Sequence, residues 1–164
     1  MPSTTTPSEP VFLDAGIFVA AVLEGHPHNA ETRPLVEAAR QGHLQACTSS
    51  SVLSEVYAAL TWTGTSPQQS PDEAARLVRA LVSPKSAIRV LECNLDVLLK
   101  ALELSARHRL TARRTHDARH AATALVCGIR AVYTLDVRDW LPFEQDGLVI
   151  AGPPSSLSRL SSRP

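Results

Sequence analysis

Short apolar runs alternate with longer segments of helical periodicity along almost the whole 164-residue chain. Runs and segments of these lengths are typical of β-strands and α-helices respectively. We expect strands at 11–14, 44–47, 87–91, 131–135 and 148–150, and helices at 17–23, 28–41, 51–62, 71–82, 95–108 and 115–127. Strands that alternate with helices predict an α/β fold, in which helices cover both faces of a mostly parallel central sheet.

Capping residues mark several of the expected helix ends. Ser50 or Ser51 is the expected N-cap of the helix that follows the second strand, and Asn94 is the expected N-cap of the helix that follows the third. Gly42 and Gly128 stand where helical periodicity stops, and glycine commonly ends a helix. These residues support the predicted order of elements.

The overall composition is that of a single globular domain. The chain is 44% apolar and 20% charged, and its length is sufficient to bury a core. The formal net charge is zero, which counts against a nucleic-acid partner, although a local basic patch is compatible with neutrality. Cys47, Cys93 and Cys127 lie far apart without zinc-site spacing, so we expect buried thiols in a reducing cytosol.

The two ends of the chain differ in composition from its middle. Residues 1–9 and 153–164 are rich in proline and hydroxyl residues, so we expect both to be disordered and the domain to span 10–152. The N-terminal sequence lacks the charged and apolar regions of a signal peptide. No apolar run approaches the roughly 20 residues of a membrane span. We therefore expect a cytoplasmic protein without membrane interactions.

Five acidic residues stand at the boundaries of the expected strands and helices: Asp14, Glu55, Asp117, Asp136 and Asp139. Carboxylates in such places lie at the carboxyl edge of the sheet, where open parallel sheets bind their ligands. Carboxylates that converge there repel one another unless a cation neutralises them, and hard oxygen ligands suit Mg²⁺ or Mn²⁺. The pattern predicts a metal site that assists phosphodiester chemistry.

Four segments carry these acids, and they are 12–15 (FLDA), 51–60 (SVLSEVYAAL), 117–124 (DARHAATA) and 132–140 (VYTLDVRDW). Together, in this order, they resemble the PIN domain, and within that family the VapC toxins of bacterial toxin–antitoxin pairs; the resemblance covers nearly all of 10–150. It implies a three-layer α/β/α sandwich and an Mg²⁺- or Mn²⁺-dependent endoribonuclease that acts on RNA. It also implies a homodimer inhibited by a cognate antitoxin protein.

The chain departs from the family pattern at two places. Gly16 stands two residues after the first aspartate, where family members often carry Ser, Thr or Asn, so one polar contact to the site is missing. After the fourth strand, the toxins often have Asn and then Asp, whereas Asp136 and Asp139 are both acidic here. Which of the two is the fourth site acid is therefore open.

Residues near these segments have two interpretations each. Thr134 is either a hydrogen-bond partner of a site carboxylate or an ordinary strand residue. His116 and His120 are four apart on one helix, but no third His or Cys ligand accompanies them, so we favour packing or capping over a metal pair. Arg113 and Arg114 either contact RNA phosphates or form a solvated loop.

The aromatic residues and two helices suggest an interface. We expect Trp62, Tyr57 and Phe18 to lie in the core or at a dimer interface, because they do not form a stacking surface for a single strand. The candidate dimer surface is the pair of helices 51–62 and 71–82, which carry Tyr57, Leu60, Trp62, Leu77, Leu81 and Val82. The alternative is that these side chains pack inside the monomer.

Other functions remain to be weighed against a nuclease. A PIN-like module that binds RNA or a partner without cutting it stays open, because of Gly16 and the neutral net charge. A phospho-acceptor receiver domain is disfavoured, because it needs a lysine after a late strand and Lys100 is the last lysine of the chain. No nucleophilic triad or phosphate-binding loop is present in the sequence, so covalent or NTP-driven chemistry lacks support.

Overall fold

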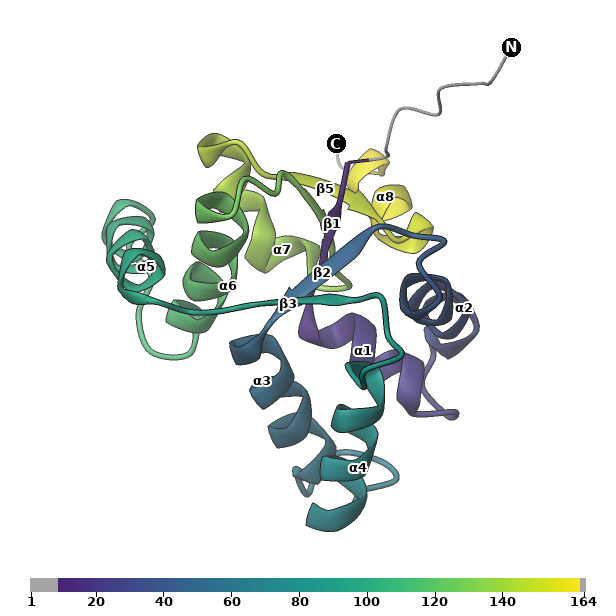
Figure 1. Ribbon diagram of the computed structural model, residues 1–164. Helices are drawn as coiled ribbons and strands as arrows, with labels where there is room; N and C mark the ends of the chain where they lie inside the picture. Colours follow the sequence, from purple (N-terminus) through teal and green to yellow (C-terminus); the bar gives the residue numbers. More distant parts are fainter. Residues whose placement is uncertain (1–8, 163–164) are drawn as a thin grey trace.

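A computed structural model of the protein describes residues 9–162 and contains one sheet of five strands, all parallel (Figure 1). The spatial order is β3-β2-β1-β4-β5. The strands are β1 (Val11–Leu13), β2 (Ala46–Ser49), β3 (Arg89–Leu91), β4 (Ala131–Tyr133) and β5 (Val149–Gly152). The predicted α/β fold with a parallel sheet is confirmed.

Helices cover both faces of this sheet and make the three-layer sandwich. One group consists of α1 (Ala15–Val22), α2 (Asn29–Arg40), α3 (Ser50–Thr61) and α4 (Pro71–Leu81), in which α1 contacts α2 and α3, and α3 contacts α4. The other consists of α5 (Leu95–Arg107), α6 (Arg114–Val126), the short α7 (Val137–Trp140) and the 3₁₀-helix η1 (Leu141–Asp146). Figure 1 shows α5, α6 and α7 on one side and α1, α2 and α4 on the other.

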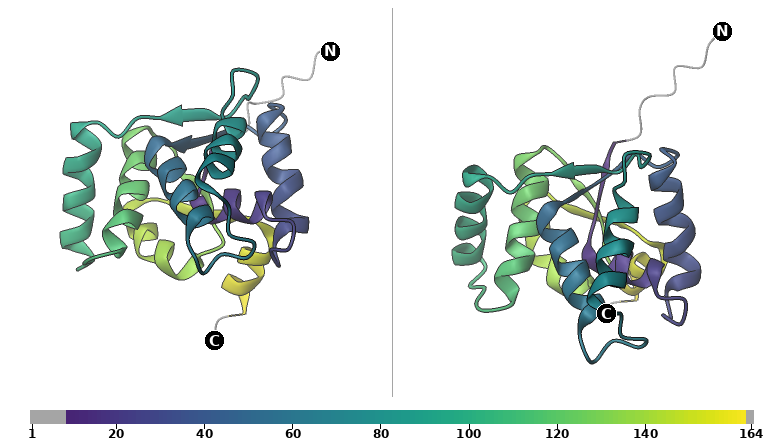
Figure 2. Two further views of the ribbon diagram at one scale, coloured as in Figure 1. Left: turned by 90° about the horizontal axis from the view of Figure 1, so that it is seen from below. Right: turned by 60° about the horizontal axis from the view of Figure 1, so that its bottom comes forward.

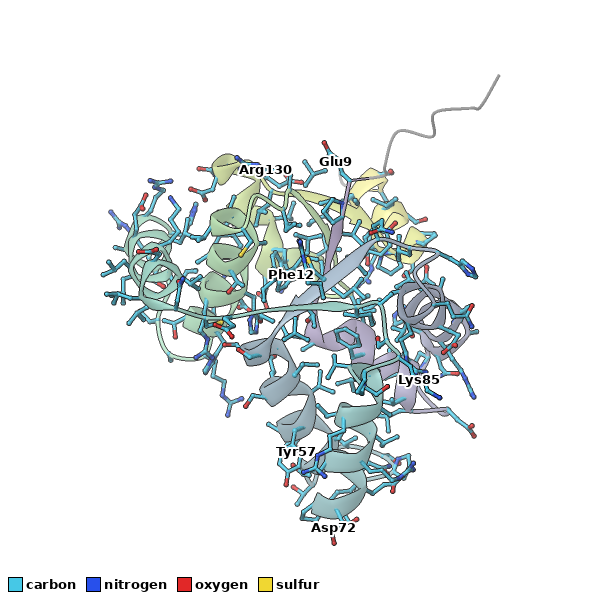
Figure 3. The ribbon with its side chains drawn as sticks, in the orientation of Figure 1. Glu9, Phe12, Tyr57, Asp72, Lys85 and Arg130 are labelled. Atoms are coloured by element: carbon cyan, nitrogen blue, oxygen red, sulfur yellow. The ribbon has the colours of Figure 1, made fainter. Side chains whose placement is uncertain are left out.

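The central strand β1 is buried along its whole length. It pairs with β2 through Val11 and Ala46, and with β4 through Val11 and Ala131. Phe12 lies at the middle of the molecule (Figure 3) and its ring is 6.0 Å from that of Trp140, centroid to centroid. Phe143 adds an edge-on contact to the same tryptophan. Apolar burial on both faces is what a strand in the centre of a parallel sheet requires.

The helix ends follow the expected capping rules, with one shift. The N-cap of α3 is Ser49, whose hydroxyl accepts from Val52 N at 3.1 Å, so the prediction of Ser50 or Ser51 is wrong by one or two residues. Asn94 caps α5 as predicted. Gly128 follows α6 with a φ of +74°, a conformation that favours glycine.

The predicted disordered C-terminal tail at 153–164 is wrong for most of its length. Residues Pro154–Ser161 form α8. The buried Ser156 hydroxyl donates to Thr134 O at 2.6 Å, and Ser155 donates from both its backbone and its hydroxyl to Glu31. The hydroxyl residues that made this segment look disordered instead provide its docking bonds. The expected N-terminal disorder falls almost wholly on residues 1–8, which lie outside the described part of the chain.

The predicted dimer surface on α3 and α4 is largely used inside the monomer. Leu60 and Leu81 are buried, because α3 and α4 pack against each other and the core. Leu77 and Val82 pack partly against the same core. Tyr57 and Trp62 are the exceptions, with 37% and 66% of their surface exposed.

Two further expectations are decided by burial and helix length. Of the three cysteines predicted to be buried, Cys47 is buried, Cys93 is half-buried and Cys127 is exposed. Within residues 9–162, no helix has both the length and the apolar character to cross a bilayer.

One edge of the sheet gathers the starts of several helices. β1 leads into α1 and β2 leads into α3 at the same edge, which Figure 2 shows from below. α7 begins just beyond the end of β4. Because parallel strands all end on one side, polar residues at these junctions meet there.

Candidate active site

All five predicted acids lie at this carboxyl edge. Asp14 directly follows β1, Glu55 lies in the second turn of α3, and Asp117 lies in the first turn of α6. Asp136 precedes α7 and Asp139 lies within it. They line two adjoining hollows. The outer groove, of about 860 Å³, is lined by Glu55, Asp117, Asp136 and Asp139, and the inner hollow, of about 500 Å³, by Asp14, Glu55, Asp117 and Asp136.

Asp14 is the anchored member of the group. Its Oδ2 accepts from Thr134 Oγ1 at 2.7 Å and from Trp140 Nε1 at 2.9 Å. Its Oδ1 accepts from Ala15 N at 2.8 Å, at the start of α1. Of the two interpretations of Thr134, the structure therefore supports the hydrogen-bond partner of a site carboxylate. Because three donors from three separate parts of the chain hold this side chain, its position is fixed by the fold.

Burial makes the negative charge of Asp14 unfavourable. Its side chain is 8% exposed. Burial raises the pKa of the Asp14 carboxyl, although the nearby His120 and the hydrogen bonds from Thr134, Ala15 and Trp140 lower it. The negative charge of Asp14 is therefore costly unless a positive charge reaches the inner hollow.

Burial and neighbouring negative charge also act on Asp117. Burial, and then the negative charges of Asp139 and Asp14, raise the pKa of Asp117 to about 7. Burial and the charge of Asp139 also raise the pKa of Asp136, against a smaller lowering by Arg159 of α8. Like charges that perturb one another in this way are typical of a functional site.

Asp136 and Asp139 both line the outer groove, one directly before α7 and the other in its first turn. The backbone N of Asp136 donates to Thr134 Oγ1 at 2.9 Å, so the threonine that holds Asp14 also positions Asp136. Asp139 lies 3.9 Å from Arg114 and contributes most to raising the pKa of Asp117 after burial. Both acids therefore stay candidates for the fourth site acid.

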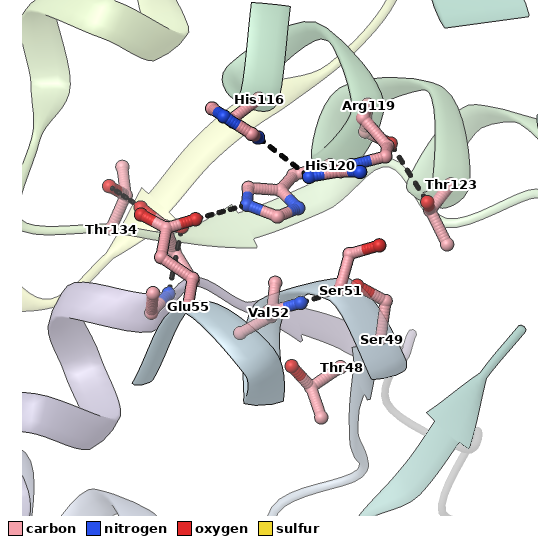
Figure 4. A network of polar contacts seen from close by, with 12 residues as sticks. Thr48, Ser49, Ser51, Val52, Glu55, His116, Arg119, His120, Thr123 and Thr134 are labelled. Carbon is pink, nitrogen blue, oxygen red and sulfur yellow. Dashed lines mark hydrogen bonds and ion pairs between the residues drawn. The ribbon is translucent and has the colours of Figure 1, made fainter. Parts of the chain in front are cut away.

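Glu55 differs from the aspartates because its partner is a buried imidazole. His120 Nε2 donates to Glu55 Oε2 at 2.6 Å across the gap between α3 and α6 (Figure 4). The imidazole is 1% exposed and the glutamate side chain 47% exposed, so the histidine is the fixed partner. The hydrogen bond from His120 lowers the pKa of Glu55. Glu55 is thus held as a carboxylate.

The two histidines of α6 do not act as a pair. His116 Nδ1 accepts from Arg119 Nη2 at 2.6 Å, whereas His120 faces Glu55 (Figure 4). His120 Nδ1 is buried without a hydrogen-bond partner among the described residues. Packing alone, which we favoured for His120, is an incomplete description, because the ring also orients a site carboxylate. Its sequence neighbourhood gave no sign of this, since Glu55 is 65 positions away.

Two other residues of the site were not predicted. Trp140 was not expected to reach Asp14, although a buried indole N–H needs an acceptor and carboxylates were the acceptors nearby in the pattern. Arg159 lies in the segment expected to be disordered and, with Asp136 and Arg138, lines a third hollow beside the site. Only the prediction of α8 would have drawn attention to it.

The donor set fits a hard divalent cation in chemical type. Within residues 9–162, no three His, Cys, Asp or Glu side chains are already grouped as a metal-binding set. However, four carboxylates line the outer groove, and burial together with neighbouring negative charge raises the pKa of Asp117. Oxygen ligands with surplus negative charge suit Mg²⁺ or Mn²⁺. The acids therefore fit Mg²⁺ or Mn²⁺ in chemical type. To bind one ion together, their side chains have to turn toward a common point.

Gly16 lines the inner hollow beside Asp14. A Cβ built on it would meet only Leu135 Cβ, at an ordinary 3.8 Å. Glycine is therefore not required there for space, and the absence of a hydroxyl at this position is a difference in chemistry between this site and the family pattern.

Comparisons with known proteins point to one family. A family model described as the PIN domain matches residues 11–141. No curated protein matches the chain significantly.

Solved structures share the fold. The VapC20 toxin of Mycobacterium tuberculosis, described as cleaving the sarcin–ricin loop, superposes with a TM-score of 0.66 at 22% identity, over 87% of this chain and 99% of the toxin. VapBC2 of Rickettsia felis bound to promoter DNA gives 0.59 at 15% identity, over 85% and 96%. A toxin–antitoxin complex of Klebsiella pneumoniae gives 0.57 at 18% identity, over 85% and 96%.

Replacing Asp117 by asparagine tests the electrostatics of the site. Because the pKa of Asp117 is raised to about 7, the native state binds more protons than the unfolded chain between about pH 4 and pH 7, and the free energy of unfolding falls as pH rises through this range. With allowance for solvent screening, we expect Asp117→Asn to stabilise the metal-free protein by about 1–2 kcal/mol at pH 8 and hardly at pH 4. Calorimetry in EDTA should show a melting temperature about 2–8 °C higher at pH 8 only.

Asp14→Asn is the matched variant with the opposite expectation. An asparagine at position 14 must turn its NH₂ group toward one of the N–H or O–H donors that Asp14 now accepts from, so this variant should melt below the wild type despite losing the same charge. If both variants shift the melting temperature in the same direction, or if the Asp117→Asn gain is independent of pH, this electrostatic account is wrong.

Proposed function

Because this chain belongs to the PIN domain family, we propose that it is an Mg²⁺- or Mn²⁺-dependent endoribonuclease and the toxin of a VapC-type toxin–antitoxin pair. The observation that supports this most is the convergence of the five acids at one edge, with the pKa of Asp117 raised to about 7. Carboxyl groups that raise one another's pKa in this way are typical of a site that binds a cation.

We assign the holding of the metal to Asp14, Glu55, Asp117 and one or both of Asp136 and Asp139. A bound divalent ion supplies positive charge for the phosphate oxygens and lowers the pKa of a water molecule. The reaction is hydrolysis, in which a water oxygen forms a bond to phosphorus while one ester P–O bond breaks.

The protein's own contribution is preorganisation. Thr134 and Trp140 hold the Asp14 carboxylate in one orientation, so little rearrangement remains for it when substrate and metal arrive. His120 does the same for Glu55 from the opposite wall. Partners of this kind typically change metal affinity or activity by about 10–100-fold when removed.

RNA cleavage is the direct test of this proposal. We expect the full chain to cut RNA with Mg²⁺ or Mn²⁺, to stop in EDTA and to recover when metal is restored. Asp117→Asn should lower the rate by about 100-fold or more, because a direct ligand should matter at least as much as its outer partners. Asp72→Asn, an exposed acid in the first turn of α4, is the matched control and should cut at the wild-type rate.

Two other results would contradict parts of this proposal. Normal cleavage by Asp117→Asn would remove it from the mechanism. RNA binding without cleavage under any metal would instead favour a PIN-like module that binds RNA or a partner without cutting it.

The homodimer and the antitoxin also remain proposals. Structures with this fold include toxin–antitoxin complexes, which supports an antitoxin partner here.

For the dimer, we replace the surface predicted on α3 and α4 by one on α5. Four leucines of α5, spaced by three or four residues, are 50–66% exposed: Leu95, Leu98, Leu99 and Leu102. The opposite face of α5 packs on the core through Val97, Ala101 and Leu104. A straight apolar stripe on an outer helix suits an isologous contact with a second copy.

Charge on this stripe should break the dimer. We expect the wild type to be a dimer by light scattering and the variant Leu98→Glu with Leu102→Glu to be a folded monomer, since both side chains are at least half exposed. Leu157→Glu, at a 39% exposed leucine of α8, should remain dimeric. A wild type that is monomeric, with the stripe needed only for antitoxin binding, would contradict this assignment.

A further inference from the structure

The outer groove runs between one face of α3 and the start of α6. On α3 this face presents Ser51, Ser54, Glu55, Ala58 and Trp62, which recur at helical spacing. The side chains between Glu55 and Trp62 are small, so the groove stays open along roughly 10 Å of helix. A channel with a carboxylate near one end and an indole at the other extends well beyond the acids themselves.

The two helices are antiparallel, which sets what faces Trp62. Near the start of α3, Ser51 Oγ lies 3.0 Å from Cys93 Sγ, which in turn lies 3.5 Å from Thr123 Oγ1 on α6. One turn further along α3, Glu55 meets His120. The outer end of α3, with Trp62, therefore lies toward the first residues of α6, where Arg113 also lines the groove.

Trp62 is held in an exposed position. It follows α3 as its C-cap, and 66% of its surface is exposed, whereas Trp140 is 2% exposed. Gly64 lies so close behind the ring that a Cβ there would collide with it. The loop after α3 therefore supports the indole from behind. We expected Trp62 in the core or at a dimer interface, and its exposure excludes the core.

Three arginines surround the groove on the α6 side. Arg113 has no ion-pair or side-chain hydrogen-bond partner among residues 9–162. Arg114 lies 3.9 Å from Asp139, and Arg119 donates to His116 while its Nε is buried without a partner in the same part of the chain. Although the net charge of the chain is zero, these arginines make the α6 side of the groove locally positive, next to the acids.

We propose that this groove binds a short stretch of single-stranded RNA, with an unpaired base stacked on Trp62 and the flanking phosphate paired with Arg113. The proposal rests on the proposed nuclease function and adds to it a base-stacking position at Trp62 and a phosphate contact at Arg113, both outside the group of acids. An aromatic face combined with cations along a groove is the usual arrangement for binding single strands, because every base has a face that can stack. A base inside a duplex is not free to do so.

The composition of the groove favours RNA over a protein helix. A helical partner needs several apolar anchors spaced by three or four residues, and the groove offers one large apolar side chain among cations, carboxylates and serines. The apolar stripe that would suit such a partner is on α5.

Tryptophan fluorescence provides the test, because Trp140 is buried and Trp62 is the exposed reporter. The Asp117→Asn full chain, which should not cut, is titrated with single-stranded RNA of about six nucleotides, with anisotropy of a labelled RNA as a second readout. We expect quenching by single-stranded RNA and little by a duplex hairpin stem. Added in the same background, Trp62→Leu should weaken binding about 5- to 150-fold and Trp62→Phe much less.

Matched controls separate stacking and charge from general damage. Tyr57→Leu, an exposed aromatic residue on α3 outside the groove, should bind as the parent does. Arg113→Gln should lower the magnitude of the slope of log affinity against log salt by about 0.7, whereas Arg79→Gln on α4 should not.

The contradicting outcomes are distinct from failure of the nuclease itself. RNA that binds without quenching Trp62, equal quenching by the duplex, or a Trp62→Leu single variant that binds and cuts as the wild type does would overturn the groove assignment and leave the nuclease standing. Quenching by the antitoxin but not by RNA would make this a protein interface and also overturn it. A chain that neither binds nor cuts RNA would overturn both proposals.

Discussion

The carboxylate of Asp14 is the point on which the site depends. It ends the central strand, accepts a hydrogen bond at the start of α1, and accepts two more from Thr134 beyond β4 and Trp140 of α7. Because Trp140 also packs against Phe12 and Phe143, the same side chain belongs to the core and to the site. The donors that fix Asp14 also bury it, and burial makes its charge costly.

The pKa values of Glu55 and Asp117 are shifted in opposite directions. Glu55 has a buried histidine as its partner, so the pKa of this carboxyl is lowered. Asp117 has two like charges among its strongest influences, so its pKa is raised to about 7. The site therefore contains one carboxyl group whose pKa is lowered, that of Glu55, and three whose pKa is raised, those of Asp14, Asp117 and Asp136. The raised pKa values support the proposal that a cation binds here. Asparagine at 117 and at 14 should act in opposite directions because only Asp14 accepts three hydrogen bonds that an amide cannot all accept.

The sequence predicted those features that follow from local pattern and topology. Short apolar runs located every strand to within a few residues, and the rule that parallel strands end on one side was enough to gather the five acids. Features that depend on packing between distant segments could not be predicted. The bond between Glu55 and His120 crosses 65 positions, and α8 docks through hydroxyls whose composition resembled disorder. Likewise, periodicity showed that α5 is apolar but not that one of its leucine faces is left exposed.

Titration of Mn²⁺ into the full chain, by calorimetry in buffers of different ionisation enthalpy, tests most directly whether these acids form one cation site. Since the pKa of Asp117 is about 7, metal binding at pH 6 must displace its proton, whereas at pH 8.5 the carboxyl has already lost it. We expect Mn²⁺ to bind with release of about one proton at pH 6 and close to none at pH 8.5, with the release at pH 6 reduced in Asp117→Asn. Absence of Mn²⁺ binding, or the same proton release from the wild type and from Asp117→Asn, would contradict the account.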